Sequence, residues 1–296
     1  KKIFALFFAD DSNMFLTGKD PDKFIKEMRA EMIKVVDWLN INKLSLNLKK
    51  THFMLFRKNK EKVTFSEKLI INNVNIAHVE KTKFLGVIID KSLSFEHHVT
   101  YIKGKISRAI GILRKCRPVL NNNTMRDMYN TFVYPYYTYC IEVWGYICND
   151  KTLDCLIKLQ KRSIETISGA KKYSKSKPLF EEHKILTLEK IYVYCIQLLM
   201  FKNNNKQIPE VVSNLFTRND EIHNKDTRQS KFFHTPLIKT PYLSKTCRKT
   251  GVAIFNFFKK HITLNISYGV YKTHLKKFLL EVNTEKLVNN ILAHFC

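Results

Sequence analysis

The spacing of apolar residues changes near Ser94, and this change constrains the fold more than any other feature. Before Ser94, short runs rich in Phe, Ile and Val are separated by polar turns, which is typical of β-strands. After it, apolar residues recur every three or four positions, as they do in amphipathic helices. Because only 8 Gly and 7 Pro interrupt 296 residues, long helices are favoured over an all-β fold. We therefore expect an α+β protein, in which a small strand-rich region precedes a helical one.

Two adjacent acids, Asp10 and Asp11, separate an aromatic-rich run that begins at Ile3 from a second apolar run that ends at Leu16. This arrangement predicts a strand, a tight turn and a second strand over 3–17, with both acids at the turn. Neighbouring carboxylates repel each other unless cations offset their charge, and a pair of divalent metals does so in phosphoryl and nucleotidyl transfer. The alternative is an exposed hairpin turn, where Asp is common.

The rest of the strand-rich region has further start and stop signals. A helix is predicted to begin at Asp20, with an acid at its cap and Pro21 in its first turn, and to end near 40–43. A strand follows at 52–56, and a hairpin is predicted around Asn72-Asn73. Residues 83–90 are predicted to form one strand with Gly86 inside it, where glycine often marks close approach of the backbone to a ligand or to another strand.

The helical region begins with an apolar stripe, whose members are Phe95, Val99, Ile102, Ile106, Ile110 and Leu113. The other faces of this helix carry the basic residues Lys103, Lys105, Arg108, Arg114 and Lys115. Further helices are predicted at 124–140, with a kink at Pro135, at 153–167 and at 188–201, and looser order is expected beyond Asn203. We interpret Trp144 and the tyrosines of 129–139 as packing residues rather than as a platform for stacking bases.

Charge favours a polyanionic partner. The chain has 51 Lys and Arg against 26 Asp and Glu, a formal net charge of +25 that is spread along its length. Such a field attracts phosphate backbones, and nucleic acid is the expected ligand; the alternative is a merely basic protein. No apolar run approaches the roughly 20 residues of a membrane span. Seven cysteines without a Cys-x-x-Cys pair argue against a zinc site or a disulfide framework and for reduced, intracellular thiols.

Several segments, taken in order, resemble the second half of the palm in reverse transcriptases of non-LTR retrotransposons (LINE elements of the jockey or CR1-like kind). They are Phe8-Ala9-Asp10-Asp11, the run from Asn40 to Thr51, and Phe84-Leu85-Gly86-Val87. Downstream, the run is similar to the segment after the palm, at Tyr134-Pro135, Trp144-Gly145, Leu159-Gln160-Lys161-Arg162 and Pro178-Leu179-Phe180. A looser likeness includes Arg228-Gln229-Ser230 and the run from Thr246 to Gly251.

The resemblance implies roles for the residues of the hairpin. Asp10 would be the principal ligand of two Mg²⁺ ions and Asp11 a secondary one. Lys50, in the Asn-x-x-Lys-Thr motif, would stabilise the departing pyrophosphate; the alternative is an ordinary solvated lysine. Phe8 and Ala9 would lie beside the substrate, with the ring of Phe8 near the primer terminus.

The resemblance also implies how the chain holds nucleic acid. Phe84, Leu85 and Gly86 would grip the primer end, although a core strand with a bulge is the alternative. The following helices would form a thumb that holds duplex, with Lys103, Lys105, Arg108, Arg114 and Lys115 on it. We expect a partial palm at 1–92, a thumb-like domain at 93–170 and a helical C-terminal region at 171–296. The partners would be an RNA template, a DNA primer and a dNTP.

In this family the first catalytic aspartate, the template-binding loop and the fingers precede the hairpin. Because the chain begins at Lys1, shortly before the hairpin, we expect it to be part of a longer polypeptide, to keep two of three catalytic carboxylates and to be inactive alone. A different hypothesis is a non-catalytic nucleic-acid-binding module or a degenerate transposon relic. The family implies work in the nucleus, and the sequence leaves the oligomeric state open.

Overall fold

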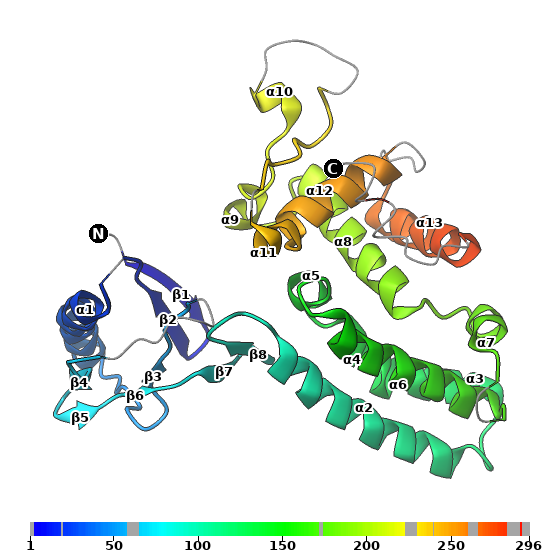
Figure 1. Cartoon of the computed structure of the whole chain (residues 1–296), viewed down its shortest axis with the longest axis horizontal. Coiled ribbons are helices and arrows are strands. Elements are labelled where there is room, and N and C mark those ends of the chain that lie inside the picture. Colours follow the sequence, from blue (N-terminus) through cyan, green and yellow to red (C-terminus); the bar gives the residue numbers. More distant parts are fainter. Residues whose placement is uncertain are drawn as a thin grey trace. The chain divides into compact units, whose positions relative to one another are not determined.

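The computed structural model describes residues 3–18, 20–57, 65–171, 174–222, 230–238, 240–259, 266–282 and 291. Contacts divide the chain into two compact units, Lys1–Leu93 and Ser94–Cys296. The named strands all lie in the first unit, coloured blue to cyan in Figure 1, and the second unit is built from helices. The predicted α+β class is confirmed. The residues Arg228 and Gln229 of the looser likeness lie outside the described residues.

The described residues of the first unit form one long helix and eight short strands. In order they are β1 Phe4–Phe8, β2 Asp11–Phe15, α1 Pro21–Ile41, β3 His52–Phe53, β4 Ile70–Ile71, β5 Val74–Asn75, β6 Ala77–His78, β7 Lys81–Phe84 and β8 Val87–Asp90. Three antiparallel pairs, β1–β2, β4–β5 and β7–β8, join residues that are close in sequence, and β3 pairs with β6 in parallel. Within the described residues the strands therefore form four separate pairs rather than one continuous sheet.

Helix α1 begins where its sequence signals predict. The Asp20 carboxylate accepts hydrogen bonds from the backbone N–H of Asp22 (3.0 Å) and Lys23 (3.4 Å), and Pro21 occupies the first turn. Its apolar face forms the core of the unit with the strands around β4; the buried residues are Ile25, Met32, Val36, Leu69, Ile71 and Ile76. Met14 of β2 packs against this core, so it anchors the β1–β2 hairpin to the unit.

The backbone conformations of the turn residues determine where the two remaining hairpins reverse direction. Asn72 and Asn73 adopt φ of 49° and 60°, which asparagine tolerates well, and the hairpin predicted there is confirmed. The single strand predicted at 83–90 is wrong, because Leu85 (φ 42°) and Gly86 (φ 87°) turn the chain and pair β7 with β8. Gly86 therefore supplies a left-handed turn conformation, not a flat strand position that a ligand approaches.

The second unit is mostly helical in its described part, where an isolated β-bridge joins Arg218 to Phe233. Its long helices are α2 Glu96–Cys116, α3 Asn122–Phe132, α6 Asp150–Ser168, α8 Leu188–Asn204, α12 Cys247–Phe258 and α13 Tyr268–Glu281. Shorter ones are α4 Tyr134–Thr138, α5 Ile141–Trp144, α7 Ser176–Glu182, α9 Glu210–Ser213, α10 Asn219–Ile222 and α11 Pro241–Ser244. The stripe predicted for α2 is buried along its whole length.

Three expectations for this unit need correction. The helix predicted at 124–140 is broken into α3 and α4, because Pro135 fits the first turn of a new helix and cannot continue the old one. Looser order is expected beyond Asn203, but among the described residues there α12 and α13 are long helices, and most of α12 is buried. The sequence predicts that His98 is a surface or partly buried polar residue, but it is only 2% exposed and packs edge-on against Trp144, with ring centroids 5.5 Å apart.

The side chains of Trp144, Tyr129 and Tyr137 are fully buried, which confirms the packing role predicted for them. The prediction is wrong for Tyr139, whose side chain is 52% exposed. The cysteines of the described ranges are all free. No helix in the described part of the chain has the length and apolar character to cross a membrane.

Candidate active site and nucleic-acid interface

The two acids lie at the tip of the β1–β2 hairpin. Strand pairing runs from Phe4 opposite Phe15 to Phe8 opposite Asp11, which leaves Ala9 and Asp10 as a two-residue turn. Asp11 is therefore the first residue of β2 and not part of the turn, a small departure from the predicted arrangement. Both carboxylates are exposed, and Ala9 holds φ at 51°, in the left-handed region that alanine adopts at a cost of about 1–2 kcal/mol.

Strand β1 exposes an unusual amount of apolar surface. All five of its residues are exposed, with Phe7 at 69% and Phe8 at 63%. Phe4 and Leu6 are also exposed, and because successive side chains alternate, both faces of the strand carry apolar groups. A contiguous apolar patch of this kind marks an interaction site.

Lys50 is presented by a hydrogen-bonded turn made by its own motif. The Asn47 carbonyl oxygen accepts from the backbone N–H of Lys50 (3.0 Å) and of Thr51 (3.0 Å), and from the Thr51 hydroxyl (2.9 Å). The Asn47 side-chain oxygen also accepts from the Lys50 N–H (3.2 Å). The first and last residues of Asn-x-x-Lys-Thr thus hold the turn closed, and the Lys50 side chain is exposed.

His52 links this turn to the β7–β8 hairpin. Its Nδ1 lies 3.0 Å from the Lys50 carbonyl oxygen, and its Nε2 lies 2.6 Å from the Thr82 hydroxyl in β7. The turn of that hairpin carries Leu85 and Gly86, which are half-buried like the preceding Phe84. The structure therefore ties Lys50 to the segment predicted to grip the primer. Sequence reasoning missed Asn47, Thr51 and His52 as supporting residues, although asparagine before a turn is a usable signal.

Asp10 and Asp11 are the candidate metal ligands of the hairpin tip. Across the described ranges, no group of three or more His, Cys, Asp or Glu side chains is placed to hold a metal ion. The carboxylates themselves are hard oxygen ligands, the class that Mg²⁺ prefers. Mg²⁺ commonly uses only one or two protein carboxylates and completes its shell with substrate phosphates and water. This donor pair therefore fits a metal shared with a nucleotide substrate.

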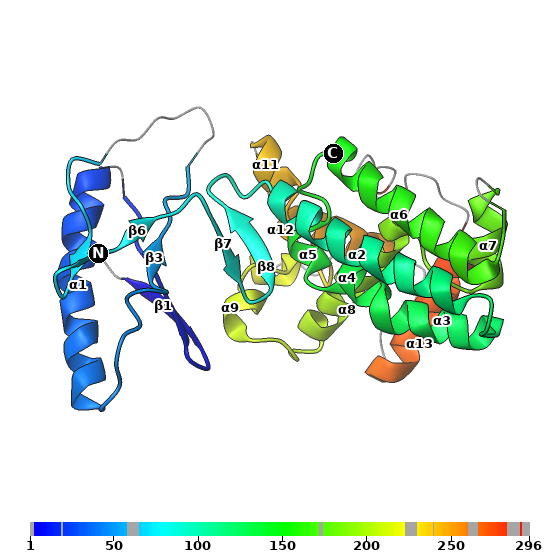
Figure 2. The same ribbon diagram turned by 90° about the horizontal axis from the view of Figure 1, so that it is seen from below.

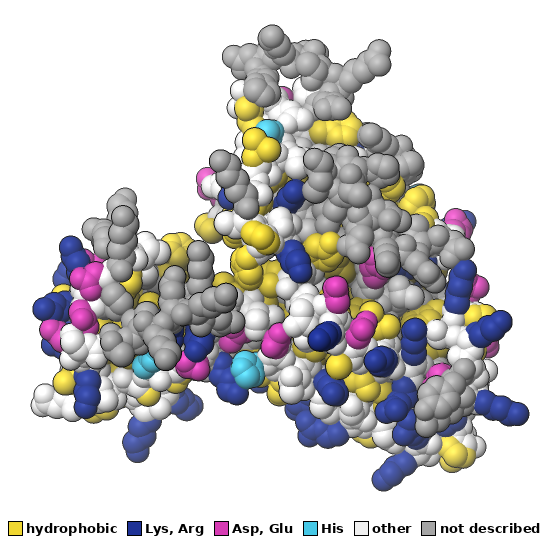
Figure 3. Space-filling model, in the orientation of Figure 1, with side chains coloured by type: hydrophobic (Ala, Val, Ile, Leu, Met, Phe, Trp, Pro, Cys, Tyr) yellow, Lys and Arg dark blue, Asp and Glu magenta, His cyan; other side chains and the backbone are white. Residues whose placement is uncertain are grey.

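The basic residues predicted on α2 do line its outer side. Lys103, Arg108, Arg114 and Lys115 are exposed, whereas Lys105 is half-buried with its ammonium 5.5 Å from the centre of the Tyr101 ring. On the same side, the positions that a Cβ would occupy on Gly104 and Gly111 have open space around them. Figure 3 shows dark-blue side chains gathered over α2 and around α7. The outer side of α2 is thus cationic and free of bulky groups along part of its length.

The chain is similar to polymerases of mobile elements. It is 30% identical over 112 residues to the RNA-directed DNA polymerase from mobile element jockey of Drosophila funebris, which covers 37% of this chain and 12% of that protein. It is 27% identical over 119 residues to the RNA-directed DNA polymerase from mobile element jockey of Drosophila melanogaster, a match that covers 39% of this chain and 13% of that protein. It is 24% identical over 121 residues to the probable RNA-directed DNA polymerase from transposon X-element of Drosophila melanogaster, 40% and 13%.

These relatives confirm the resemblance to non-LTR reverse transcriptases that the motifs predict. The matches span only 12–13% of the length of the relatives. No family model matches the chain. No solved structure matches it either.

Proposed function

We propose that this chain is a piece of the reverse transcriptase of a non-LTR retrotransposon. The complete enzyme would join deoxynucleotides to a primer 3′-hydroxyl on an RNA template, in the nucleus. The observation that carries the proposal is the hairpin tip, where Asp10 and Asp11 are exposed together in a chain similar to RNA-directed DNA polymerases. Because the matches span so little of those relatives, we expect the chain to act only with the rest of its polymerase.

In this proposal the hairpin tip binds the cations of the reaction. Asp10 would be the principal ligand of Mg²⁺ and Asp11 a secondary one. When bound, Mg²⁺ would neutralise charge on the substrate phosphates and orient the primer 3′-hydroxyl. The exposed ring of Phe8, which pairs with Asp11 across the hairpin, would pack near the primer end with Ala9 beside it.

Lys50 would act on the leaving pyrophosphate and not on the attacking 3′-hydroxyl. Negative charge develops on the leaving pyrophosphate, and a fixed cation placed there lowers the barrier. The turn closed by Asn47 and Thr51 restricts the backbone of Lys50, and His52 ties it to β7. Phe84, at the end of β7, and Leu85 and Gly86, in the turn that follows, would then hold the primer strand within reach.

The second unit would hold the template–primer duplex. The exposed cations of α2 would neutralise phosphates, and the open space over Gly104 and Gly111 would let a strand approach the helix closely. We assign 93–170 to a thumb and 171–296 to a helical C-terminal region on the same grounds. The partial palm would comprise 1–92.

Primer extension by the complete polymerase tests the proposal. We expect Asp10→Asn to reduce Mg²⁺-dependent extension on an RNA template by at least about 100-fold, since metal-ion stabilisation is worth several kcal/mol. Asp37→Asn, at an exposed position of α1, is the matched control and should leave extension unchanged. Extension that survives the Asp10 substitution would show that the site is assigned wrongly.

A second candidate is a nucleic-acid-binding module without catalysis, favoured by the net charge of +25. One comparison of duplex binding with primer extension distinguishes the two candidate functions. If this chain binds RNA–DNA duplex with a steep salt dependence while the complete polymerase shows no extension, the binding module is the correct assignment. If Asp10-dependent extension is found, the module is part of an enzyme.

A further inference from the structure

Helices α2 and α6 lie side by side and run in the same direction (Figure 2). At their starting ends, the Asn149 side chain caps α6 by accepting from the Thr152 N–H (2.8 Å) and donates to the carboxylate of Glu96 in the first turn of α2 (2.5 Å). At their far ends, the Arg117 guanidinium, just after α2, donates to the carbonyl oxygen of Ser168 in the last turn of α6 (3.2 Å). The two helices are therefore aligned along their whole length.

The outer side of α6 also carries cations. Lys151, Lys158, Lys161 and Arg162 are exposed, and their spacing of seven, three and one residues places them on one side of the helix. Two acids of the same helix, Asp150 and Asp154, are exposed as well, so the cations outnumber the acids by four to two. None of these α6 residues belongs to the set predicted on α2.

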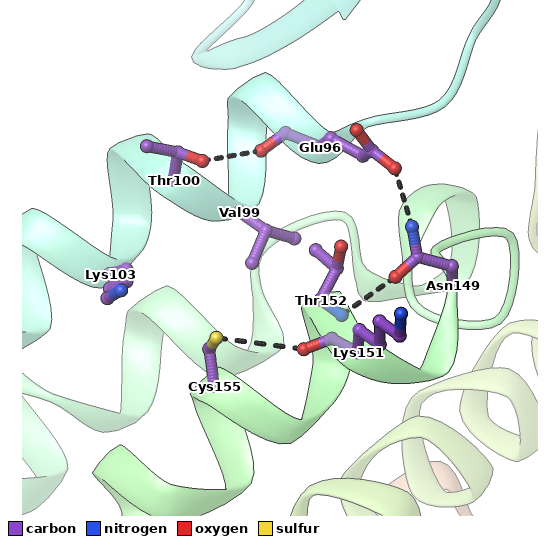
Figure 4. Close-up of a pocket in the computed structure, with 8 residues that line it drawn as sticks. All are labelled: Glu96, Val99, Thr100, Lys103, Asn149, Lys151, Thr152 and Cys155. Carbon is purple, nitrogen blue, oxygen red and sulfur yellow. Dashed lines mark hydrogen bonds between the residues drawn. The ribbon is translucent and has the colours of Figure 1, made fainter.

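Between the starting ends of the two helices the surface is hollowed. Figure 4 shows a pocket of about 250 Å³, lined by Val99, Thr100 and Lys103 of α2 and by Lys151, Thr152 and Cys155 of α6. One lysine therefore lies on each side of this hollow. Glu96 also faces it and accepts a hydrogen bond from Asn149, so the hollow carries two positive charges and one negative charge.

We propose that the seam between α2 and α6 binds one phosphodiester strand. The α2–α6 seam is defined by Lys103 and Arg114 of α2 and by Lys151, Lys158 and Arg162 of α6. The inference rests on the proposed function and adds to it a second row of cations parallel to those of α2. Phosphates of the strand would lie between the two rows, and the hollow at Lys103 and Lys151 would receive one of them.

Spacing along α6 fits a nucleic-acid backbone. A helix rises 1.5 Å per residue, so Lys151 and Lys158 are about 10 Å apart along it. Three nucleotide steps of a duplex strand span about the same length, at 3.4 Å each. A strand that follows the seam can therefore place phosphates about three steps apart near Lys151 and Lys158, and each contact adds to the salt dependence of binding.

The test is duplex binding by this chain, measured as fluorescence anisotropy of a labelled RNA–DNA duplex across a salt series. The seam variant is Lys151→Ala with Lys158→Ala and Arg162→Ala. We expect the slope of log K against log salt to fall in magnitude by about 2–3, and affinity near 0.1 M salt to fall about 10- to 100-fold. A control that removes the same charges at exposed sites of the same unit, Lys245→Ala with Arg248→Ala and Lys272→Ala, should change both far less.

The possible outcomes distinguish failure of the proposed function from failure of the α2–α6 seam as a binding site. If the wild-type chain does not bind duplex, the proposed function fails together with the inference. If it binds and the seam variant matches the control, only overall charge matters and the seam is wrong. If a polyglutamate peptide of equal charge binds as tightly as the duplex and is weakened equally by the seam variant, the seam is a site for acidic polymers and the assignment to nucleic acid is wrong.

A second measurement on the wild-type chain avoids any variant. Cys155 lines the hollow, whereas Cys116, also half-buried, lies at the far end of α2. We expect saturating duplex to slow alkylation of Cys155 several-fold and to leave Cys116 nearly unchanged. Equal rates at Cys155 with and without duplex would contradict the inference.

Discussion

At the scale of single residues, two glycines illustrate how backbone conformation decides the effect of one substitution. Gly86 holds φ at 87° in the β7–β8 turn, whereas Gly104 lies within helix α2 with open space around it. We expect Gly86→Ala to lower the free energy of unfolding by about 1 kcal/mol or more, because the left-handed conformation strains an L side chain. The same change at Gly104 should raise it by up to about 1 kcal/mol through helix propensity.

Urea unfolding of this chain, followed by backbone amide exchange in each unit, measures both changes. Destabilisation by Gly104→Ala, or no effect of Gly86→Ala, would contradict the conformations described for these two positions.

His98 gives a prediction about pH. Its burial against Trp144 lowers the pKa of its imidazole to about 4, because the charged form loses its hydration. In the unfolded chain the pKa is near 6.5, so between these values the unfolded state binds the proton and the folded state does not. The stability contributed by neutral His98 is therefore present above pH 6.5 and is lost as the pH falls toward 4.

The measurement is the free energy of unfolding at pH 7 and at pH 5 for the wild-type chain and for His98→Phe. We expect the wild-type chain to lose about 1–2 kcal/mol more than the variant over this range. Other histidines with a lowered pKa, His78 and His183, are unchanged in the variant and cancel in the comparison. Equal losses would show that His98 is not protected from protonation.

At the scale of elements, the turn formed by Asn47 and Thr51 links local structure to chemistry. Replacing Thr51 with Val keeps the shape of the side chain but removes the hydroxyl that donates to the Asn47 carbonyl oxygen. Under the proposed role of Lys50, we expect the kcat of the complete polymerase to fall about 2- to 10-fold, the value of one hydrogen bond.

Thr51→Ser retains the hydroxyl and should restore most of that rate. If both variants are equally impaired, the methyl group and not the hydrogen bond is important. If Thr51→Val is impaired in a chain that already carries Lys50→Ala, the turn does not act through Lys50.

Elements whose signals are local were predictable from the sequence. Asp20 and Pro21 mark the start of α1, Asn72-Asn73 marks the β4–β5 turn, and the stripe of α2 is fully buried as expected. The β7–β8 turn was missed because Leu85 has no preference for positive φ, so only tertiary packing holds it there. Helix α12 was missed because nearby prolines suggested short segments, while its burial comes from packing against α8.

The residue types of the candidate site could be predicted from the sequence, but the contacts between them in space could not. The order of motifs pointed to Asp10, Asp11 and Lys50, since residue types carry that information. The tether through His52 depends on β3 lying beside β6 and near β7, a pairing between residues distant in the sequence. The hollow at the α2–α6 seam likewise arises from packing of helices that are far apart along the chain.

At the scale of the whole molecule, the strand-rich unit carries the residues proposed for catalysis. The helical unit carries the cations proposed to bind nucleic acid. The exposed apolar side chains of β1 offer a surface that the rest of a polymerase could cover. Because charge of one sign is spread over both units, duplex binding alone does not separate catalysis from attraction. A measurement of the chemical step is needed.

Single-turnover nucleotide incorporation by the complete polymerase tests the hairpin tip most directly. The variants to compare with wild type, at saturating Mg²⁺ and duplex, are Asp10→Asn, Asp11→Asn and Lys50→Ala. The account predicts the largest loss of rate for Asp10→Asn, at least about 100-fold, then Asp11→Asn, then Lys50→Ala, with duplex affinity unchanged in all three. A rate for Asp10→Asn within about twofold of wild type, too small a difference for a lost metal ligand, would contradict it.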